Sequence, residues 1–318
     1  MSGGAFLATA AEQQDIRGPH GNGATEAKGV GTSKWTPYLL LTPGLLWLAI
    51  FFVVPTVVLL VTSLYTGSLD AGYTFTFPGN WSTYSAVIDY WPQFVRSFVF
   101  AGLATLFTLL LAYPLAYFIA FRSGKWKATL LVLVIAPFFT SFLIRTLAWK
   151  TILADDGWVV TFLNWSHIND LLTALHLTET GRVLNTPLAV VLGLTYNFLP
   201  FMVLPLYASL DRMDPRLVEA AQDLYSSPWT ALRKVTWPLS LPGVVAGTLL
   251  TFIPAAGDYI NDELLGTTKV SMIGNVIQDQ FFVVTDYPTA SALSFVLMLA
   301  ILVLVFLYVR RAGTEELV

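Results

Sequence analysis

The sequence contains 318 residues with a formal net charge of −3; 55% of the residues are hydrophobic and only 12% are charged. A water-soluble domain carries about 25% charged residues, so this composition excludes an ordinary soluble enzyme or binding module and predicts an integral membrane protein. The chain has no cysteine, which excludes disulfide bonds, thiolate metal sites and a cysteine nucleophile.

Residues 1–37 form a segment rich in glycine, alanine and polar residues. It contains no compact apolar stretch followed by a small-residue cleavage site, so a secretory signal peptide is not predicted. Its low hydrophobicity predicts a disordered tail. The three histidines lie in this tail and in one loop without metal-ligand spacing, and no basic patch with interleaved aromatic residues is present. Neither a metal site nor nucleic-acid binding is therefore expected.

Six apolar windows follow the tail. A bilayer core about 30 Å thick is crossed by roughly 20 apolar residues in a helix, and the windows that meet this requirement are 38–64, 97–121, 127–149, 188–210, 241–258 and 289–309. Several contain prolines, which membrane helices tolerate where neighbouring helices satisfy the freed backbone groups. The sequence thus predicts an all-α protein with a six-helix membrane domain over residues 38–310 and a short tail over residues 311–318.

The lysines and arginines predict the orientation, because cytoplasmic loops carry an excess of them. With the N-terminus inside, twelve of the seventeen lie in the tails and inner loops, four lie in the outer loops, and Arg145 lies within the third window. Both tails and the loop over residues 211–239 are therefore predicted to be cytoplasmic.

The two long outer loops, residues 66–96 and 150–187, are rich in aromatic residues, and the second contains a helical-looking stretch with Trp158, Phe162 and Trp165. Tryptophan and tyrosine favour the membrane interface. These residues therefore indicate either an anchoring belt or a platform for an extracytoplasmic partner.

The cytoplasmic loop before the fifth window carries two helix-start signals. Asp214 followed by Pro215 is an N-cap with proline at the first helical position, and it predicts a short helix up to Leu224. Ser227 followed by Pro228 repeats the signal and predicts a second helix that ends near residue 235. The loop is therefore predicted to be two short helices joined by a tight turn.

Glu219, Ala220 and Ala221 lie at the centre of the first helix. Two adjacent alanines allow a large side chain or another backbone to approach closely, and Glu219 adds a charge beside them. This chemistry fits a helix that docks into a groove of another protein. An amphipathic helix lying on the membrane surface is the alternative.

This segment resembles the EAA loop of ABC importer permeases, in which Glu-Ala-Ala is followed by a glycine and later by Leu-Pro. The matching positions are Glu219, Ala220, Ala221, Asp223, Leu224, Ser227, Pro228, Pro238, Leu241 and Pro242. The resemblance covers about residues 95–306. It implies the type I importer fold and ATPase coupling by Glu219, Ala220, Ala221, Asp223, Leu224 and Tyr225.

Two positions depart from the family pattern. Tyr225 stands where the family has glycine, and Trp237 stands where it has leucine. A bulky residue adopts positive φ at a cost of roughly 1 kcal/mol or more. We therefore expect either a different turn between the two helices or a Tyr225 side chain that fills part of the partner's groove.

Three further segments, residues 136–149, 252–266 and 271–282, are similar to the spermidine/putrescine permease subfamily. The resemblance implies polyamine uptake across a bacterial inner membrane by a multi-pass subunit. It also implies a heterodimer with a second permease subunit, two ATPase subunits and an extracytoplasmic substrate-binding protein. ATP would be bound by the ATPase partner, and no cofactor is expected in this chain.

A path for ammonium groups needs carboxylates and aromatic faces. Asp258 and Asp262 are spaced i, i+4 and would share one helix face, while Tyr259 and Glu263 would share the adjacent one. Trp149 and Tyr196 are the expected aromatic neighbours. Alternatively, the carboxylates end the fifth span in solvent or pair with Arg145. We expect Arg145 to be paired or bonded to helix C-terminal carbonyls, because an unpaired arginine would suit an anionic substrate.

Other function classes are less consistent with the sequence. No G-x-x-x-x-G-K-[ST] motif is present, so the chain is not expected to bind ATP itself. No window contains a histidine, which disfavours a membrane-embedded hydrolase or transferase, and the chain is not expected to be an enzyme. A stand-alone channel leaves the capped loop unexplained. A permease for ferric iron, an anion or an amino-acid-like solute stays as the alternative within transport.

Overall fold

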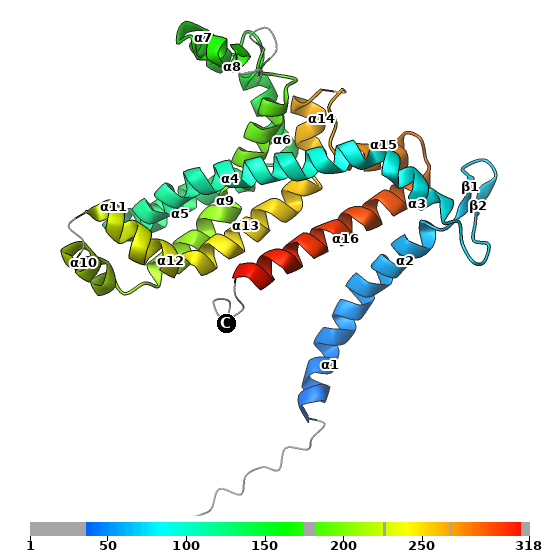
Figure 1. Ribbon diagram of the computed structural model, residues 1–318, viewed down its shortest axis with the longest axis horizontal. Coiled ribbons are helices and arrows are strands. Elements are labelled where there is room, and N and C mark those ends of the chain that lie inside the picture. The colour runs from blue at the N-terminus through cyan, green and yellow to red at the C-terminus, as the bar shows by residue number, and fades with distance from the viewer. Residues whose placement is uncertain (1–35, 175–177, 179–181, 225–226, 268, 313–318) are drawn as a thin grey trace, which may run out of the picture. The chain divides into compact units, whose positions relative to one another are not determined.

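The computed structural model describes residues 36–174, 178, 182–224, 227–267 and 269–312 (Figure 1). The predicted tails therefore lie largely outside the described residues. The chain divides into two units, Met1–Val53 and Val54–Val318. In the first unit, α1 (Thr36–Leu48) continues into a π-helical turn, η1 (Ala49–Val53).

The second unit is helical apart from one small hairpin. The hairpin pairs β1 (Thr66–Ser68) antiparallel to β2 (Gly72–Thr74), with Gly67 opposite Tyr73. The helices before the loop over residues 211–239 are α2 (Val54–Thr62), α3 (Ser82–Val87), η2 (Ile88–Tyr90), α4 (Trp91–Phe121), η3 (Gly124–Trp126), α5 (Lys127–Ile135), η4 (Ala136–Phe139), α6 (Phe142–Ile152), α7 (Trp158–Trp165), α8 (Ile168–Ala174) and α9 (Pro187–Asp211). Those that follow are α10 (Pro215–Leu224), α11 (Pro228–Ala231), η5 (Leu232–Thr236), α12 (Trp237–Leu239), α13 (Leu241–Ala256), α14 (Ile260–Leu265), α15 (Ile273–Phe282) and α16 (Tyr287–Ala312).

The helices confirm the predicted apolar windows. Four described helical segments are long and apolar enough to cross a membrane: Tyr38–Thr62, Ser82–Phe121, Pro187–Asp211 and Tyr287–Arg311. Two bent pairs pass the same test together, Gly124–Phe139 with Phe142–Ile152 and Pro228–Leu239 with Leu241–Ala256. The described residues thus provide up to six spans.

The third window consists of two helices that meet at a break near its internal proline. Its two halves meet at an angle of 93°. Pro137 lies at the start of η4, where its missing N–H removes a helical hydrogen bond, and Thr140 is extended with φ −96° and ψ 152°. The break places α6 against α9 and α14.

The second helix of the loop over residues 211–239 also differs from its prediction. It does not end near residue 235 but continues through η5 and α12 to Leu239, and the chain bends by 67° only before α13. The π-helical turn η5 shifts the hydrogen-bond register just before Pro238, which has no N–H to donate.

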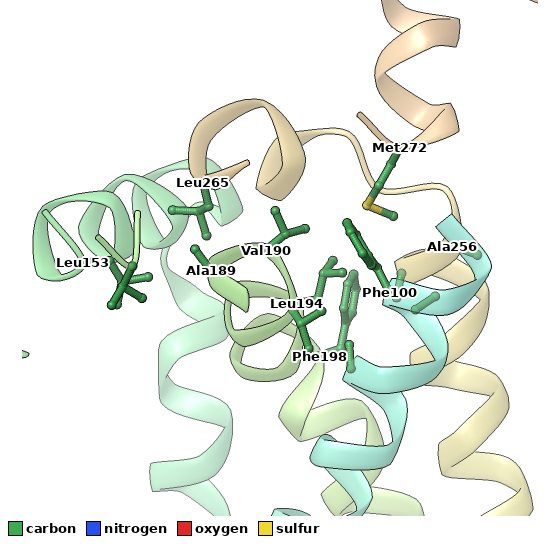
Figure 2. Packing of buried hydrophobic residues seen from close by; sticks show 14 of the residues in the cluster. Phe100, Leu153, Ala189, Val190, Leu194, Phe198, Ala256, Leu265 and Met272 are labelled. Carbon is green, nitrogen blue, oxygen red and sulfur yellow. The ribbon is translucent and has the colours of Figure 1, made fainter. Parts of the chain in front are cut away.

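Three helices, α4, α9 and α13, pack against one another as the centre of the second unit. Small residues line their contacts, as is usual where membrane helices approach closely. Ala101 and Ala104 of α4 are fully buried beside Leu194 and Phe198 of α9. Figure 2 shows Phe100 of α4 beside Phe198 in this cluster.

Gly243 of α13 marks a close approach between α13 and α9 and supports a stability prediction. A Cβ atom there would lie 2.6 Å from Cβ of Ser209 and 2.8 Å from the backbone oxygen of Pro205, both in α9. We expect Gly243→Ala to destabilise the protein by about 1–3 kcal/mol through overpacking, measured as a lower thermal unfolding midpoint in detergent. Gly102→Ala is the matched control, because a Cβ at Gly102 meets nothing within 4 Å. An equal midpoint for both variants would contradict the prediction.

The second outer loop forms the helix expected from its aromatic residues. Trp158, Phe162 and Trp165 of α7 are all exposed, whereas Val160 of the same helix is buried. The spacing i, i+4, i+7 places the three aromatic side chains on one face. This face suits both an interfacial belt and a partner platform, and both interpretations stay predictions.

Candidate functional site

The predicted pathway carboxylates lie where the fifth span ends. The prediction that Asp258 and Asp262 share one helix face is wrong, because α13 ends at Ala256 and a new helix, α14, begins at Ile260. Asp258 lies in the break, and its Oδ1 accepts hydrogen bonds from the backbone N of Asn261 at 2.7 Å and from Asn261 Nδ2 at 3.1 Å. The carboxylate therefore caps α14 instead of extending α13.

Asp262 is held in the interior. Its Oδ2 accepts a hydrogen bond from the backbone N of Met272 at 2.6 Å, and among the described residues its Oδ1 has no partner. Burial raises the pKa of Asp262 to about 6, although the hydrogen bond from Met272 opposes this shift. Asp262 thus fixes the segment that leads into α15.

The other two predicted residues of this segment are exposed. Tyr259 is exposed at the start of α14, and the Oε2 atom of Glu263 accepts a hydrogen bond from Asn275 Nδ2 at 3.0 Å. Tyr259 and Glu263 remain accessible to a solute, whereas Asp262 does not.

The two predicted aromatic residues meet across helices. Trp149 of α6 and Tyr196 of α9 have ring centroids 5.4 Å apart in an edge-to-face arrangement, and both side chains are half-buried. Edge-to-face pairs are favoured by the ring quadrupoles. The structure thus brings these two residues together.

A buried polar network next to this pair was not predicted. Asn197 of α9 donates from Nδ2 to Asn261 Oδ1 at 2.9 Å and to Thr146 Oγ1 of α6 at 3.1 Å. All three side chains are buried. A signal existed in the sequence, because a buried amide in an apolar span is costly unless it has a partner.

The prediction that Arg145 is ion-paired or bonded to helix C-terminal carbonyls is also wrong. Its guanidinium lies over the Phe138 ring at 4.6 Å and over the Phe142 ring at 5.6 Å. Its Nε and Nη1 atoms are buried and make no hydrogen bond to any described residue, so Arg145 is neither ion-paired nor bonded to helix carbonyls there. The break between η4 and α6 brings the Phe138 ring beneath the charge, and a cation–π contact takes the place of a pair.

The loop over residues 211–239 has the predicted first cap. The backbone N of Arg216 donates to Asp214 Oδ1 at 2.9 Å at the start of α10. Ser227 is extended before α11, as predicted, but its carbonyl accepts from the Thr230 N–H while its side chain makes no capping bond.

The α10 surface carries the residues predicted to meet an ATPase. Glu219, Ala220 and Asp223 are exposed, and the Leu224 side chain is 76% exposed. Trp229 of α11 is also exposed. Ala221 lies in α10, and Tyr225 lies outside the described residues. The exposed tryptophan Trp229 is of the residue type that protein interfaces enrich.

Within the described ranges, no group of three or more histidine, cysteine, aspartate or glutamate side chains could hold a metal ion.

The chain is similar to known transport proteins. Residues 112–312 match the model of a family described as "Binding-protein-dependent transport system inner membrane component". The chain is 36% identical to the spermidine/putrescine transport system permease protein PotB of Haemophilus influenzae, over 83% of this chain and 90% of that protein. It is also 36% identical to the protein of the same name from Escherichia coli, over 84% of this chain and 94% of that one.

A solved structure shares the fold. It is a bacterial ABC transporter involved in the import of the acidic polysaccharide alginate, matched with a TM-score of 0.62 at 18% identity over 87% of this chain and 95% of that chain. At this identity the likeness concerns the arrangement of helices alone.

Proposed function

Because this chain belongs to the family of binding-protein-dependent transport system inner membrane components, we propose that it is the permease subunit of an ABC importer for polyamines such as spermidine and putrescine. As a member of that family it is a multi-pass protein of the bacterial inner membrane. The proposal concerns the solute, the partners and the residues that serve them.

The observation that carries the polyamine proposal is the Asp258 carboxylate. It is half-buried at the end of α13, and no described basic side chain lies within salt-bridge distance of it. An ammonium group is the natural counter-charge for such a carboxylate. The exposed Tyr259 and Glu263 and the Trp149–Tyr196 pair add the aromatic and acidic surface that a chain of ammonium groups and methylenes needs. The permease relatives named for spermidine and putrescine agree with this chemistry.

The proposed partners follow from the loop. Two ATPase subunits would supply ATP binding and hydrolysis, a second homologous permease subunit would complete the path, and an extracytoplasmic binding protein would deliver the solute. This chain would bind no cofactor and catalyse no reaction. Glu219, Ala220, Ala221, Asp223, Leu224 and Tyr225 would contact an ATPase subunit, with both termini and the loop in the cytoplasm. The exposure of Glu219 and Leu224 supports this assignment.

A permease for an anion is the second candidate, and one observation favours it. Arg145 has two buried nitrogen atoms without a hydrogen-bond partner in the described structure, and an anion would satisfy them. The cation–π contact with Phe138 already stabilises that charge, however. Polyamine transport is therefore the better-supported function, ahead of anions, ferric iron or amino-acid-like solutes.

A competition assay tests the solute. The complete transporter in membrane vesicles takes up labelled spermidine while unlabelled putrescine, spermidine, sulfate, phosphate or ferric iron is added in excess. We expect the two polyamines to suppress labelled uptake by at least about tenfold, and we expect the anions and iron to leave it within the error of the assay. Suppression by an anion or by iron, without suppression by polyamines, would overturn the proposal.

A further inference from the structure

Three helical elements meet around the buried amides of Asn197 and Asn261. Asn261 lies in α14, Asn197 in α9 and Thr146 in α6, and α14 packs on both of the other helices. In a membrane domain a buried amide is expensive unless its hydrogen-bonding groups are used. Here one series of hydrogen bonds leads from Asn197 through Asn261 to the carboxylate of Asp258.

The direction of the network is set by Asp258. An ionised carboxylate can only accept hydrogen bonds, so Asn261 turns its Nδ2 toward Asp258 Oδ1, at 3.1 Å. The Oδ1 atom of Asn261 then faces α9, and Asn197 presents its own Nδ2 to that oxygen at 2.9 Å. Both amide orientations therefore follow from one charge.

The contact between α9 and α14 leaves no room for the network to shift. A Cβ atom added at Gly193 of α9 would lie 2.7 Å from Asn261 Oδ1 and 2.4 Å from a methyl carbon of Leu265. Asn261 can therefore sit against α9 only because residue 193 has no side chain. The side chain of Asn261 is consequently fixed from both sides.

The two oxygens of Asp258 have different roles in this arrangement. Oδ1 accepts both hydrogen bonds from Asn261, whereas no described residue donates to Oδ2. We propose that Asn261, supported by Asn197, is a positioning residue that commits one oxygen of Asp258 to the protein and leaves the other for an ammonium group of the solute. This inference rests on the proposed role of Asp258 in the path and deepens it.

A double-mutant cycle on the complete transporter tests the inference, with spermidine uptake measured over a range of concentrations. We expect Asn261→Ala to raise the half-saturating concentration by about tenfold and to leave the maximal rate within about twofold, because a charge-assisted hydrogen bond is lost while the coupling machinery is untouched. In the Asp258→Asn background the same substitution is expected to have no further effect, since only the carboxylate is positioned. A residue that merely stabilised the fold would show equal effects in both backgrounds.

Two further variants complete the design. Gly193→Ala changes no polar group but displaces Asn261. We therefore expect Gly193→Ala to lower the affinity for spermidine by about as much as Asn261→Ala does. Thr195→Ala is the matched control, because Thr195 is buried in the same helix and, among the described residues, its hydroxyl bonds only to the Val191 carbonyl. If Asn261→Ala does not reach the membrane, the cycle is run with Asn197→Ala, which leaves the bonds from Asn261 to Asp258 in place and is expected to show a smaller affinity loss of the same kind.

The outcomes separate the two ideas. The positioning role alone is overturned if Asn261→Ala lowers the affinity equally in the wild-type and Asp258→Asn backgrounds. It is also overturned if none of the Asn261, Asn197 and Gly193 variants loses affinity while Asp258→Asn still impairs uptake. Normal uptake by Asp258→Asn overturns the proposed role of Asp258 in transport, and the inference with it.

Discussion

Reversing one charge on α10, by Glu219→Lys, is expected to reduce solute uptake by at least about tenfold while the two permease subunits still assemble. Glu219 is exposed beside Ala220 on a helix capped by Asp214. Truncating or reversing a charge that pairs across a protein interface costs about 2–5 kcal/mol, and each 1.4 kcal/mol is tenfold. The loaded binding protein would then no longer stimulate ATP hydrolysis by the partner.

Three readouts on the complete transporter separate docking from other roles. They are uptake, ATP hydrolysis stimulated by the loaded binding protein, and co-purification of the second permease subunit. Asp279→Lys is the matched control, because Asp279 is an exposed acid of α15 outside the loop. Glu219→Ala should also reduce uptake, but by a smaller factor, since it removes the charge without repelling a basic partner.

The alternative function of α10, lying on the membrane surface, predicts a different result. A lysine at position 219 would strengthen attraction to anionic lipid and would leave uptake and hydrolysis intact. Unchanged uptake and unchanged hydrolysis in Glu219→Lys would therefore disprove docking to the ATPase.

Asp258→Asn is expected to raise the half-saturating polyamine concentration by about 10–100-fold. The substitution keeps the size of the side chain but removes the charge that would pair with an ammonium group. Hydrogen bonds to charged groups contribute about 1.5–3 kcal/mol, which corresponds to this range of affinity. The measurement is labelled spermidine or putrescine uptake against concentration.

Asp262→Asn provides the internal comparison. Asp262 is buried and bonded to the backbone of Met272, so its loss is expected to lower the amount of folded protein in the membrane more than the affinity for solute. The double variant with Asp258→Asn should combine both defects. Uptake with normal affinity in Asp258→Asn and in the double variant would remove these carboxylates from the transport path.

Several features could be predicted because they depend on neighbours in the sequence. The apolar windows overlap the helices that are long enough to cross a membrane, since crossing a bilayer requires a certain length of apolar chain whatever packs beside it. The cap at Asp214 and the start of α11 after Ser227 likewise depend on a few adjacent residues. The coupling role of this loop was inferred from its resemblance to the EAA loop, and it stays a prediction, as does the contact of Tyr225.

The functional geometry could not be predicted in the same way, because periodicity assumes an uninterrupted helix. The i, i+4 spacing of Asp258 and Asp262 placed them on one face, yet α13 ends at Ala256 and Asp258 caps a new helix. Arg145 was expected to have an anionic or carbonyl partner. The break after η4 supplied the Phe138 ring instead.

The sequence by itself determined that this is a multi-span membrane protein with a capped loop, because hydrophobic length and helix caps are local properties. Only the tertiary structure decided how the end of the fifth span is built. The bonds from Asn197 to Asn261 and to Thr146 join residues 64 and 51 positions apart. Which buried polar groups satisfy one another across helices depends on how those helices pack, and no spacing along the chain encodes that.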